Sequence, residues 1–201
     1  MDSARPRIVV IVASAGGVEA LSHILFDLPP TFPLCIAIVQ HRSISSPNLL
    51  AKILQRQTKL RVKDAEDGDA VEPGIVYVAP PGVHLVVDAT CRLTLVDGAK
   101  VKQVRPSGDV LFASAAEAFG SQVIALVLTG GDGDGSDGVV AVKKHGGTVI
   151  SQDEVSAQVS SMPRAAIATG DVDFVLPLAN IAWALEALAL RGVARSGSRV
   201  A

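Results

Sequence analysis

The stretch IVVIVASAGG, residues 8–17, decides the fold. Its six leading apolar residues predict a β-strand that is covered on both faces of a sheet. Four tiny residues follow and predict a sharp turn. The helical spacing of Leu21, Ile24, Leu25 and Leu28 then predicts a helix over residues 18–28 that stops at Pro29-Pro30. A strand, a tight turn and a helix in this order are typical of an open α/β sheet.

The same alternation continues along the chain. Apolar runs predict strands at residues 34–39, 75–79, 123–128, 148–151 and 174–176, and residues 61–63 are expected to form a further short strand. Helical patterns cover residues 48–57, 109–119, 136–145, 162–169 and 178–190. Ser46-Pro47 is expected to open the first of these helices and Asp109 to cap the second. In the last helix, Trp183 is expected on the stripe that faces the core. Residues 84–87 and 91–95 flank Asp88-Ala89-Thr90 and predict an antiparallel hairpin. We therefore expect a three-layer, doubly wound α/β fold whose mainly parallel sheet carries an attached antiparallel hairpin.

Length and composition narrow the class of protein. A chain of 201 residues with 49% hydrophobic residues and a mean hydropathy of +0.40 predicts one folded domain over residues 1–194, with a flexible tail at 195–201. A net charge of −2 and 3% aromatic residues argue against a nucleic-acid partner. The apolar stretches are too short for membrane insertion. The two cysteines, Cys35 and Cys91, lack metal-ligand spacing and fit a reduced, cytoplasmic compartment.

Chemically active residues follow three of the predicted strands. Ser14 follows the first strand, His41 follows the second, and the acidic loop GGDGDG at 130–135 follows the strand at 123–128. Because the carboxyl ends of parallel strands lie side by side, these groups can converge as nucleophile, base and orienting acid. The Ala15 N–H, at the start of the following helix, is a candidate donor to an oxyanion. The alternatives are a helix-capping or phosphate-binding turn at Ser14 and a structural cap at His41.

The acidic loop admits two interpretations. An EF-hand calcium loop that starts at Asp132 would need glycine at its sixth position and glutamate at its twelfth, where the chain has Asp137 and Lys143. We therefore expect no metal and no cofactor. The other interpretation is a glycine-rich loop that presents one carboxylate to His41, but the spacing does not choose between Asp132 and Asp134.

Other polar residues are expected to be structural. For His84 a structural imidazole is the simpler interpretation, and the alternative is a place in the lining of the cleft. Lys100, Lys102 and Arg105 are expected to lie in a solvated loop, and the alternative is contact with an acidic protein partner. Gln152-Asp153-Glu154 is expected to supply acids at a helix start, and the alternative is that this segment borders the active-site edge.

Seven motifs together resemble one family. They are ASAGG at 13–17, QHR at 40–42, VAPPGVH at 78–84, RPSGDVLF at 105–112, LTGGDGDG at 128–135, QDE at 152–154 and MPRAAI at 162–167. In this order they resemble the catalytic domain of the chemotaxis receptor methylesterase family, the CheB type. The resemblance runs from about Arg7 to about Leu190, nearly the whole chain.

The resemblance implies a catalytic triad of Ser14, His41 and Asp134, with the N–H groups of Ala15 and Gly131 as the oxyanion hole. It also implies a partner, the cytoplasmic domain of a methyl-accepting chemoreceptor, whose glutamyl methyl esters are the substrate of the family. Many relatives also deamidate glutamine at such sites.

The chain departs from the family pattern in several places. Relatives usually have glycine where Val12 stands, and the common LTGMG becomes LTGGD, so that Gly131 replaces a methionine and Asp132 adds a second carboxylate. Only seven residues precede the first strand, so we expect no attached receiver domain, and control by a separate receiver protein in trans becomes an option. Two other hypotheses stay open: a catalytically impaired, receptor-binding regulator of the same fold, and a nucleotide-binding module that uses Gly16-Gly17.

Overall fold

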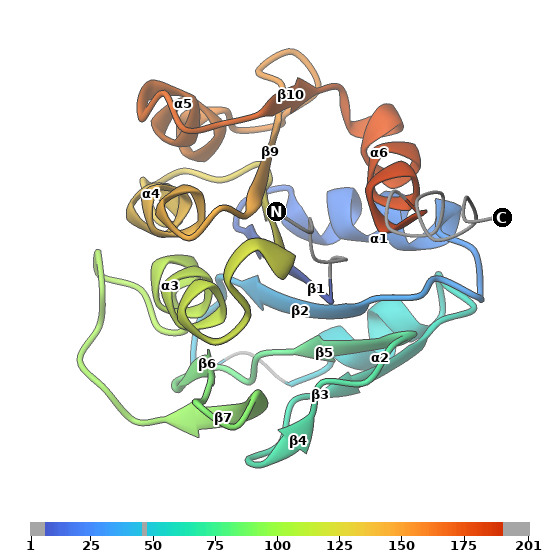
Figure 1. The fold of residues 1–201 in the computed structure, drawn as a ribbon, viewed down its shortest axis with the longest axis vertical. Helices are drawn as coiled ribbons and strands as arrows, with labels where there is room; N and C mark the ends of the chain where they lie inside the picture. The colour runs from blue at the N-terminus through green and yellow to red at the C-terminus, as the bar shows by residue number, and fades with distance from the viewer. Residues whose placement is uncertain (1–6, 46–47, 191–201) are drawn as a thin grey trace, which may run out of the picture.

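Seven parallel strands form the central sheet of the computed structural model, which describes residues 7–45 and 48–190 (Figure 1). Their order across the sheet is β10-β9-β8-β1-β2-β5-β3. Their bounds are β1 Ile8–Ala13, β2 Cys35–Gln40, β3 Arg61–Asp64, β5 Ile75–Val78, β8 Val123–Val127, β9 Thr148–Gln152 and β10 Phe174–Leu176. The four strands β1, β2, β5 and β8 are buried along their whole length, as their unbroken apolar sequences predict.

Helices cover both faces of this sheet and create two hydrophobic cores. One face carries α1 Gly17–Asp27, α2 Leu50–Gln55 and α6 Leu178–Leu190. The other face carries α3 Gly108–Phe119, α4 Ser136–Lys144 and α5 Ser161–Ala168, and a short 3₁₀ turn, Gly120–Gln122, links α3 to β8. The doubly wound, three-layer prediction is thereby confirmed.

The antiparallel hairpin is confirmed and gains a third strand. It consists of β6 His84–Val87 and β7 Arg92–Val96, and the two-residue strand β4 Asp69–Ala70 pairs with β7. These three strands form a sheet of their own. Leu85, Val87 and Leu93 attach it to the core on the α3 side of the central sheet.

The register of the central strands brings the ends of β1, β2 and β8 together. Ala13 is paired with Gln40, so Ser14 and His41 follow paired positions on neighbouring strands. The His41 N–H donates to the Ala13 carbonyl at 2.9 Å, and the Ser14 N–H donates to the Thr129 carbonyl at 2.9 Å. The chain passes from β1 to β2 on one side and returns as β8 on the other, which is the switch point where open α/β sheets bind ligands.

Several local expectations need correction. Trp183 does not face the core: it is 73% exposed, because α6 packs through Ile181, Leu185 and Leu188 instead. The second helix is shorter than predicted, and its proposed opening at Ser46-Pro47 lies outside the described residues, as does the tail at 195–201. In the part of the chain that the structure describes, no helix has the length and apolarity needed to cross a bilayer.

Candidate active site

The Ser14 turn depends on glycine at two positions. Gly16 has a φ of +77°, a conformation that L side chains rarely adopt. A Cβ on Gly17 would lie 2.7 Å from Ala13 Cβ and would also overlap the Gln40 amide. The Gln40 side chain fills this space and donates from its amide nitrogen to the carbonyls of Ser14 at 2.8 Å and His41 at 3.0 Å. One buried amide thus joins the backbone segments that carry the two predicted catalytic side chains.

The His41 ring lies between two carboxylates. Nε2 is 2.8 Å from Asp134 Oδ2, and Nδ1 is 3.1 Å from Asp132 Oδ2. The ring side chain is only 8% exposed. The sequence left the choice between Asp132 and Asp134 open, and in the structure each acid contacts one of the two ring nitrogens.

Asp134 is fixed at the start of α3. Its carboxylate accepts hydrogen bonds from Ser107 Oγ at 2.6 Å, the Gly108 N–H at 2.5 Å and the Asp109 N–H at 3.1 Å. Its burial would by itself raise the pKa of this acid, but His41 and these three donors outweigh burial and lower the pKa to about 2. The first turn of a helix also carries the positive end of its dipole. Asp134 is therefore ionised at neutral pH.

The two acids also determine the protonation of His41. Burial would by itself lower the pKa of the imidazole, whereas hydrogen bonds and charge interactions with Asp132 and Asp134 raise it, and the net result is a pKa of about 9. His41 in this arrangement is an imidazolium at neutral pH.

Ser107 contacts the site but was not predicted to do so. It lies in a segment without periodicity, and its place in the RPSGDVLF motif is the only signal for it in the sequence. His84 is structural, as predicted: it is 3% exposed, its Nδ1 accepts the Ser107 N–H at 3.2 Å and its Nε2 lies 2.9 Å from the Ala99 carbonyl. His84 thereby helps to hold Ser107 against Asp134.

The basic loop before α3 is only partly solvated, contrary to expectation. Lys102 Nζ lies 2.9 Å from Asp109 Oδ2 and 3.1 Å from Asp137 Oδ2, and it also donates to the Gly133 carbonyl at 3.0 Å. Arg105 pairs with Asp97 and with the Gly98 carbonyl. The bonds of Lys102 fasten the loop to the start of α4 and to the acidic loop, whereas those of Arg105 stay within the loop.

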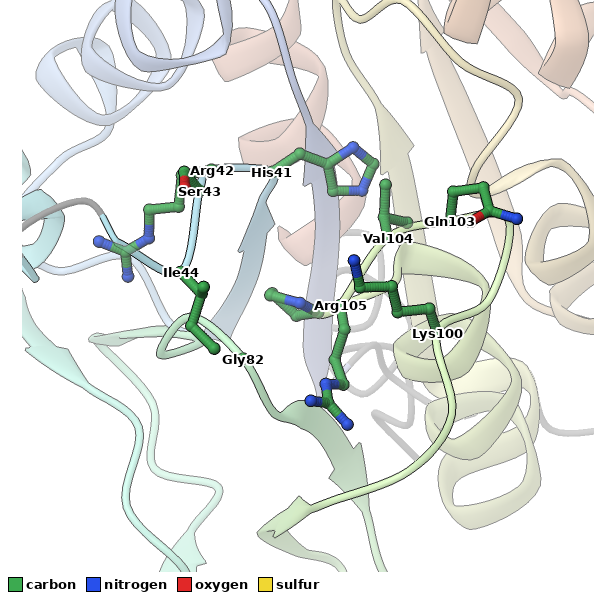
Figure 2. Close-up of a pocket in the computed structure, with 10 residues that line it drawn as sticks. His41, Arg42, Ser43, Ile44, Gly82, Lys100, Gln103, Val104 and Arg105 are labelled. Atoms are coloured by element: carbon green, nitrogen blue, oxygen red, sulfur yellow. The ribbon is translucent and has the colours of Figure 1, made fainter.

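A cavity of about 240 Å³ opens beside His41 (Figure 2). Arg42, Lys100 and Arg105 contribute to its lining. In Figure 2 the Lys100 side chain points from its loop toward the middle of this cavity, below the His41 ring. The guanidinium of Arg42 is engaged elsewhere, since it donates to the Ala79 carbonyl at 3.1 Å. Lys100 is therefore the cation that the cavity presents to a ligand.

Ser14 is half-buried beside this arrangement and is not bonded to it. Within residues 7–45 and 48–190, the Ser14 hydroxyl makes no hydrogen bond, to His41 or to any other group. Asp134 contacts Nε2 of His41, and Asp132 occupies the other ring nitrogen, Nδ1. The N–H groups of Ala15 and Gly131 also donate to no group of the described chain, so both are free to bind an oxygen atom.

Two residues at the ends of β8 and β9 shape the far side of the Ser14 turn. Thr129 Oγ1 donates to the Ala15 carbonyl at 2.8 Å, and Gln152 Oε1 accepts the Thr129 N–H at 2.9 Å. The expectation that Gln152-Asp153-Glu154 starts a helix is wrong. Glu154 lies in a turn, and α5 begins only at Ser161.

Val12, where relatives usually have glycine, is accommodated by two other glycines. A Cβ on Gly108 would lie 2.5 Å from Val12 Cβ, and a Cβ on Gly135 would lie 2.8 Å from Val12 Cγ1. The Val12 side chain thus occupies the space beneath the starts of α3 and α4. For a metal ion, the described residues offer no suitable group of three His, Cys, Asp or Glu side chains.

Comparison with known proteins identifies the family. The family model described as CheB methylesterase matches residues 9–185. The crystal structure of the Thermotoga maritima CheB methylesterase catalytic domain has 40% sequence identity and a TM-score of 0.86, and the match covers 92% of this chain and 100% of that one. A relative from Leptospira interrogans is 39% identical over 174 residues, which are 87% of this chain and 90% of the relative.

Longer relatives match over part of their length. The protein-glutamate methylesterase FrzG of Myxococcus xanthus is 43% identical over 178 residues, which are 89% of this chain and 53% of FrzG. The protein-glutamate methylesterase/protein-glutamine glutaminase 1 of Saccharophagus degradans is 43% identical over 176 residues, 87% of this chain and 48% of the relative. The chain thus spans about half the length of these two proteins. The fold, the family model and the relatives agree that this chain belongs to the CheB methylesterase family of hydrolases.

Proposed function

We propose that this chain hydrolyses methyl esters of glutamate side chains in a protein substrate, with Ser14, His41 and Asp134 as its catalytic triad. One observation carries the proposal. The His41 ring lies 2.8 Å from an ionised, fully buried Asp134, and Ser14 follows the strand position paired with the residue before His41. The relatives named as protein-glutamate methylesterases support the choice of substrate.

The reaction follows the general scheme of serine esterases. His41, once neutral, takes the proton of the Ser14 hydroxyl as the serine oxygen attacks the ester carbonyl. The bond to the methoxy group breaks, His41 returns the proton, and methanol leaves. Water then attacks the acyl-serine bond by the same proton route and releases the glutamate carboxylate. Asp134 keeps its charge throughout and stabilises the imidazolium.

The oxyanion of each tetrahedral intermediate would be bound by the N–H groups of Ala15 and Gly131. Both groups lack a partner within the described chain and flank the Ser14 turn. Donors that are fixed before the reaction stabilise developing charge without reorganisation, and one such donor contributes roughly 10²–10³ in kcat.

The substrate that fits best is a glutamate-bearing segment of a methyl-accepting chemoreceptor on its cytoplasmic side. A glutamate-bearing segment is acidic, and the cavity beside His41 presents the Lys100 amine without a counter-ion in the described chain. Several relatives are also named protein-glutamine glutaminases. Deamidation is the same attack with ammonia in place of methanol as the leaving group, so we propose it as a second activity of this site.

The test uses a receptor cytoplasmic domain that carries methyl-labelled glutamyl esters. We expect release of labelled methanol by the wild-type chain and a loss on the order of 10⁴-fold or more in Ser14→Ala. Ser22→Ala is the matched control, because Ser22 lies on α1 and its hydroxyl, among the described residues, bonds only to the Val18 carbonyl. Undiminished methanol release by Ser14→Ala would refute the assignment.

A second candidate function rests on the missing bond between Ser14 and His41. A chain whose base is held by Asp132 could bind a receptor without turning over, as a catalytically impaired regulator. A fluorophosphonate probe separates the two candidates, because it labels an activated serine. Labelling of the wild-type chain that is lost in Ser14→Ala supports the esterase. A chain that binds the receptor domain but takes up no probe between pH 6 and 10 supports the regulator.

A further inference from the structure

The two carboxylates that flank His41 differ in how firmly they are held. Asp134 is fully buried and accepts three hydrogen bonds from the start of α3 in addition to that from His41. The side chain of Asp132 is 32% exposed. Apart from His41, its one hydrogen-bond partner among residues 7–45 and 48–190 is the Asp134 N–H, which donates to Oδ1 at 3.0 Å. Of the two acids, Asp132 is therefore the one that can leave the ring.

This contact bears directly on the role of His41 as a base. An ionised carboxylate only accepts hydrogen bonds, so a ring that contacts one through each nitrogen carries a proton on both. Such an imidazolium has no lone pair with which to accept the serine proton. Asp134 needs Nε2 as its donor, which leaves Nδ1 as the nitrogen for Ser14. Asp132 Oδ2 occupies that nitrogen at 3.1 Å.

The remaining charged groups around His41 leave this conclusion unchanged. Asp109 lies behind Asp134 and is paired with Lys102, and Arg105 is paired with Asp97. Arg42, next in the chain, donates to the Ala79 carbonyl. Lys100 lines the cavity that His41 also lines. Asp132 is thus the charge whose removal would free a ring nitrogen and leave the buried network around Asp134 in place.

We propose that Asp132 is a positioning residue that holds His41 in a protonated resting state, and that its carboxylate must leave Nδ1 before Ser14 can bond to that nitrogen. This inference rests on the proposed function, since it assigns Asp132 a role in the same site. The glycines at 131 and 133 flank Asp132, and a Cβ on either would come no closer than 3.9 Å to any residue beyond its chain neighbours, so the space on both sides of Asp132 is open. The upward shift of the His41 pKa to about 9, to which Asp132 contributes, supports the proposal.

The test compares the wild-type chain with Asp132→Asn and Asp132→Gly. An adjacent opposite charge shifts a pKa by roughly 1–3 units, so its removal increases the neutral fraction of His41 at pH 7 by about tenfold or more. We expect kcat/KM for methanol release at pH 7 to rise by about that factor in both variants, and the ascending limb of the pH profile, where His41 loses its proton, to move to lower pH. Asp137→Asn is the matched control, because that carboxylate is 78% exposed and pairs with Lys102 rather than His41.

A second readout does not depend on turnover. The His41 pKa, followed by NMR of isotopically labelled histidine, should fall in Asp132→Asn and stay at the wild-type value in Asp137→Asn. An unchanged His41 pKa, or an Asp132→Asn profile that coincides with that of the wild type, overturns the role of Asp132. If no variant releases methanol and Ser14 takes up no fluorophosphonate, the proposed function fails instead, and the NMR titration still decides whether Asp132 controls the ring.

Discussion

At the scale of single residues, the most consequential feature is the charge on His41. A buried imidazolium between two carboxylates stabilises the folded chain because unfolding separates the three charges. The folded pKa of about 9 lies above the ordinary histidine pKa of 6.5, which applies to the unfolded chain. The stabilisation is therefore complete below about pH 6.5 and is lost as the pH rises through about 9.

This linkage predicts a pH-dependent difference between the wild-type chain and His41→Asn. The free energy of unfolding, measured in urea, should favour the wild type most at pH 6, and the difference should shrink steadily toward pH 10. The alkaline measurements serve as the internal reference, because there both chains are neutral at this position. A difference that stayed constant from pH 6 to pH 10 would contradict the charge state assigned to His41.

The sequence predicts residues of this site only where a strand supports them. Ser14 and His41 were found because each follows an unbroken apolar run, and parallel strands bring their ends together. Ser107 contacts Asp134 across a gap of 27 residues, through a turn whose shape depends on His84 and α3. No local pattern encodes that contact. The spacing also could not separate Asp132 from Asp134, because side chains two residues apart in a glycine-rich loop have no fixed relative direction.

At the scale of secondary structure elements, the loop between β8 and α4 is tight at its start and open in its middle. A Cβ on Gly130 would lie 2.8 Å from Ser14 Cβ and would overlap the Met162 sulfur, whereas one on Gly133 would come no closer than 3.9 Å to Ala165. Backbone bonds fix Gly130 as well: its N–H donates to the Val159 carbonyl at 2.8 Å, and its carbonyl accepts the Met162 N–H at 3.0 Å. The close approach of Gly130 therefore determines where Ser14 lies.

Gly130→Ala and Gly133→Ala test this difference as a matched pair. Overpacking at Gly130 should cost about 1–3 kcal/mol of unfolding free energy and should lower kcat, because the added methyl group displaces Ser14. Gly133→Ala should stay within about 0.5 kcal/mol of the wild type. Urea unfolding and methanol release measure the two effects. Equal behaviour of the two variants would mean that the loop start does not position the serine.

Elements with long apolar patterns were the predictable part of the fold. Each of the seven strands in the central sheet was expected within one residue of its observed bounds. The fully buried strands β1, β2, β5 and β8 were the clearest, because burial on both faces requires an unbroken apolar run. The strand β4 has two residues and no pattern of its own, so it could not be predicted. In α6 the alanines between the larger side chains allow more than one apolar stripe, and the expectation followed the wrong one at Trp183.

At the scale of the whole molecule, two hydrophobic cores stabilise one sheet, and α6 completes one of them. Leu185 is fully buried against that core, whereas Trp183, on the same helix, is 73% exposed. The single tryptophan of the chain is thus a surface residue and a natural probe of this helix.

Leu185→Ala should destabilise the chain by about 2–5 kcal/mol through the cavity it leaves, and Trp183→Ala should change the unfolding free energy by less than about 0.5 kcal/mol. Urea unfolding followed by circular dichroism measures both. The fluorescence of the native wild-type chain should already have the emission of a water-exposed indole. A blue-shifted emission, or a large loss of stability in Trp183→Ala, would place the indole in an interface that the described chain does not form.

The amide of Gln40 has a consequence for how the site becomes active. Because it ties the carbonyls of Ser14 and His41 together at 2.8 and 3.0 Å, the two strand ends have little freedom to slide or separate. The changes that remain are a rotation of the Ser14 side chain and a rotation of the Asp132 carboxylate away from His41. Rotations of that kind take picoseconds to nanoseconds, whereas hinge motions of whole domains take microseconds to milliseconds. Assembly of this triad would then be far faster than turnover, and the chemical step or product release would be rate-limiting.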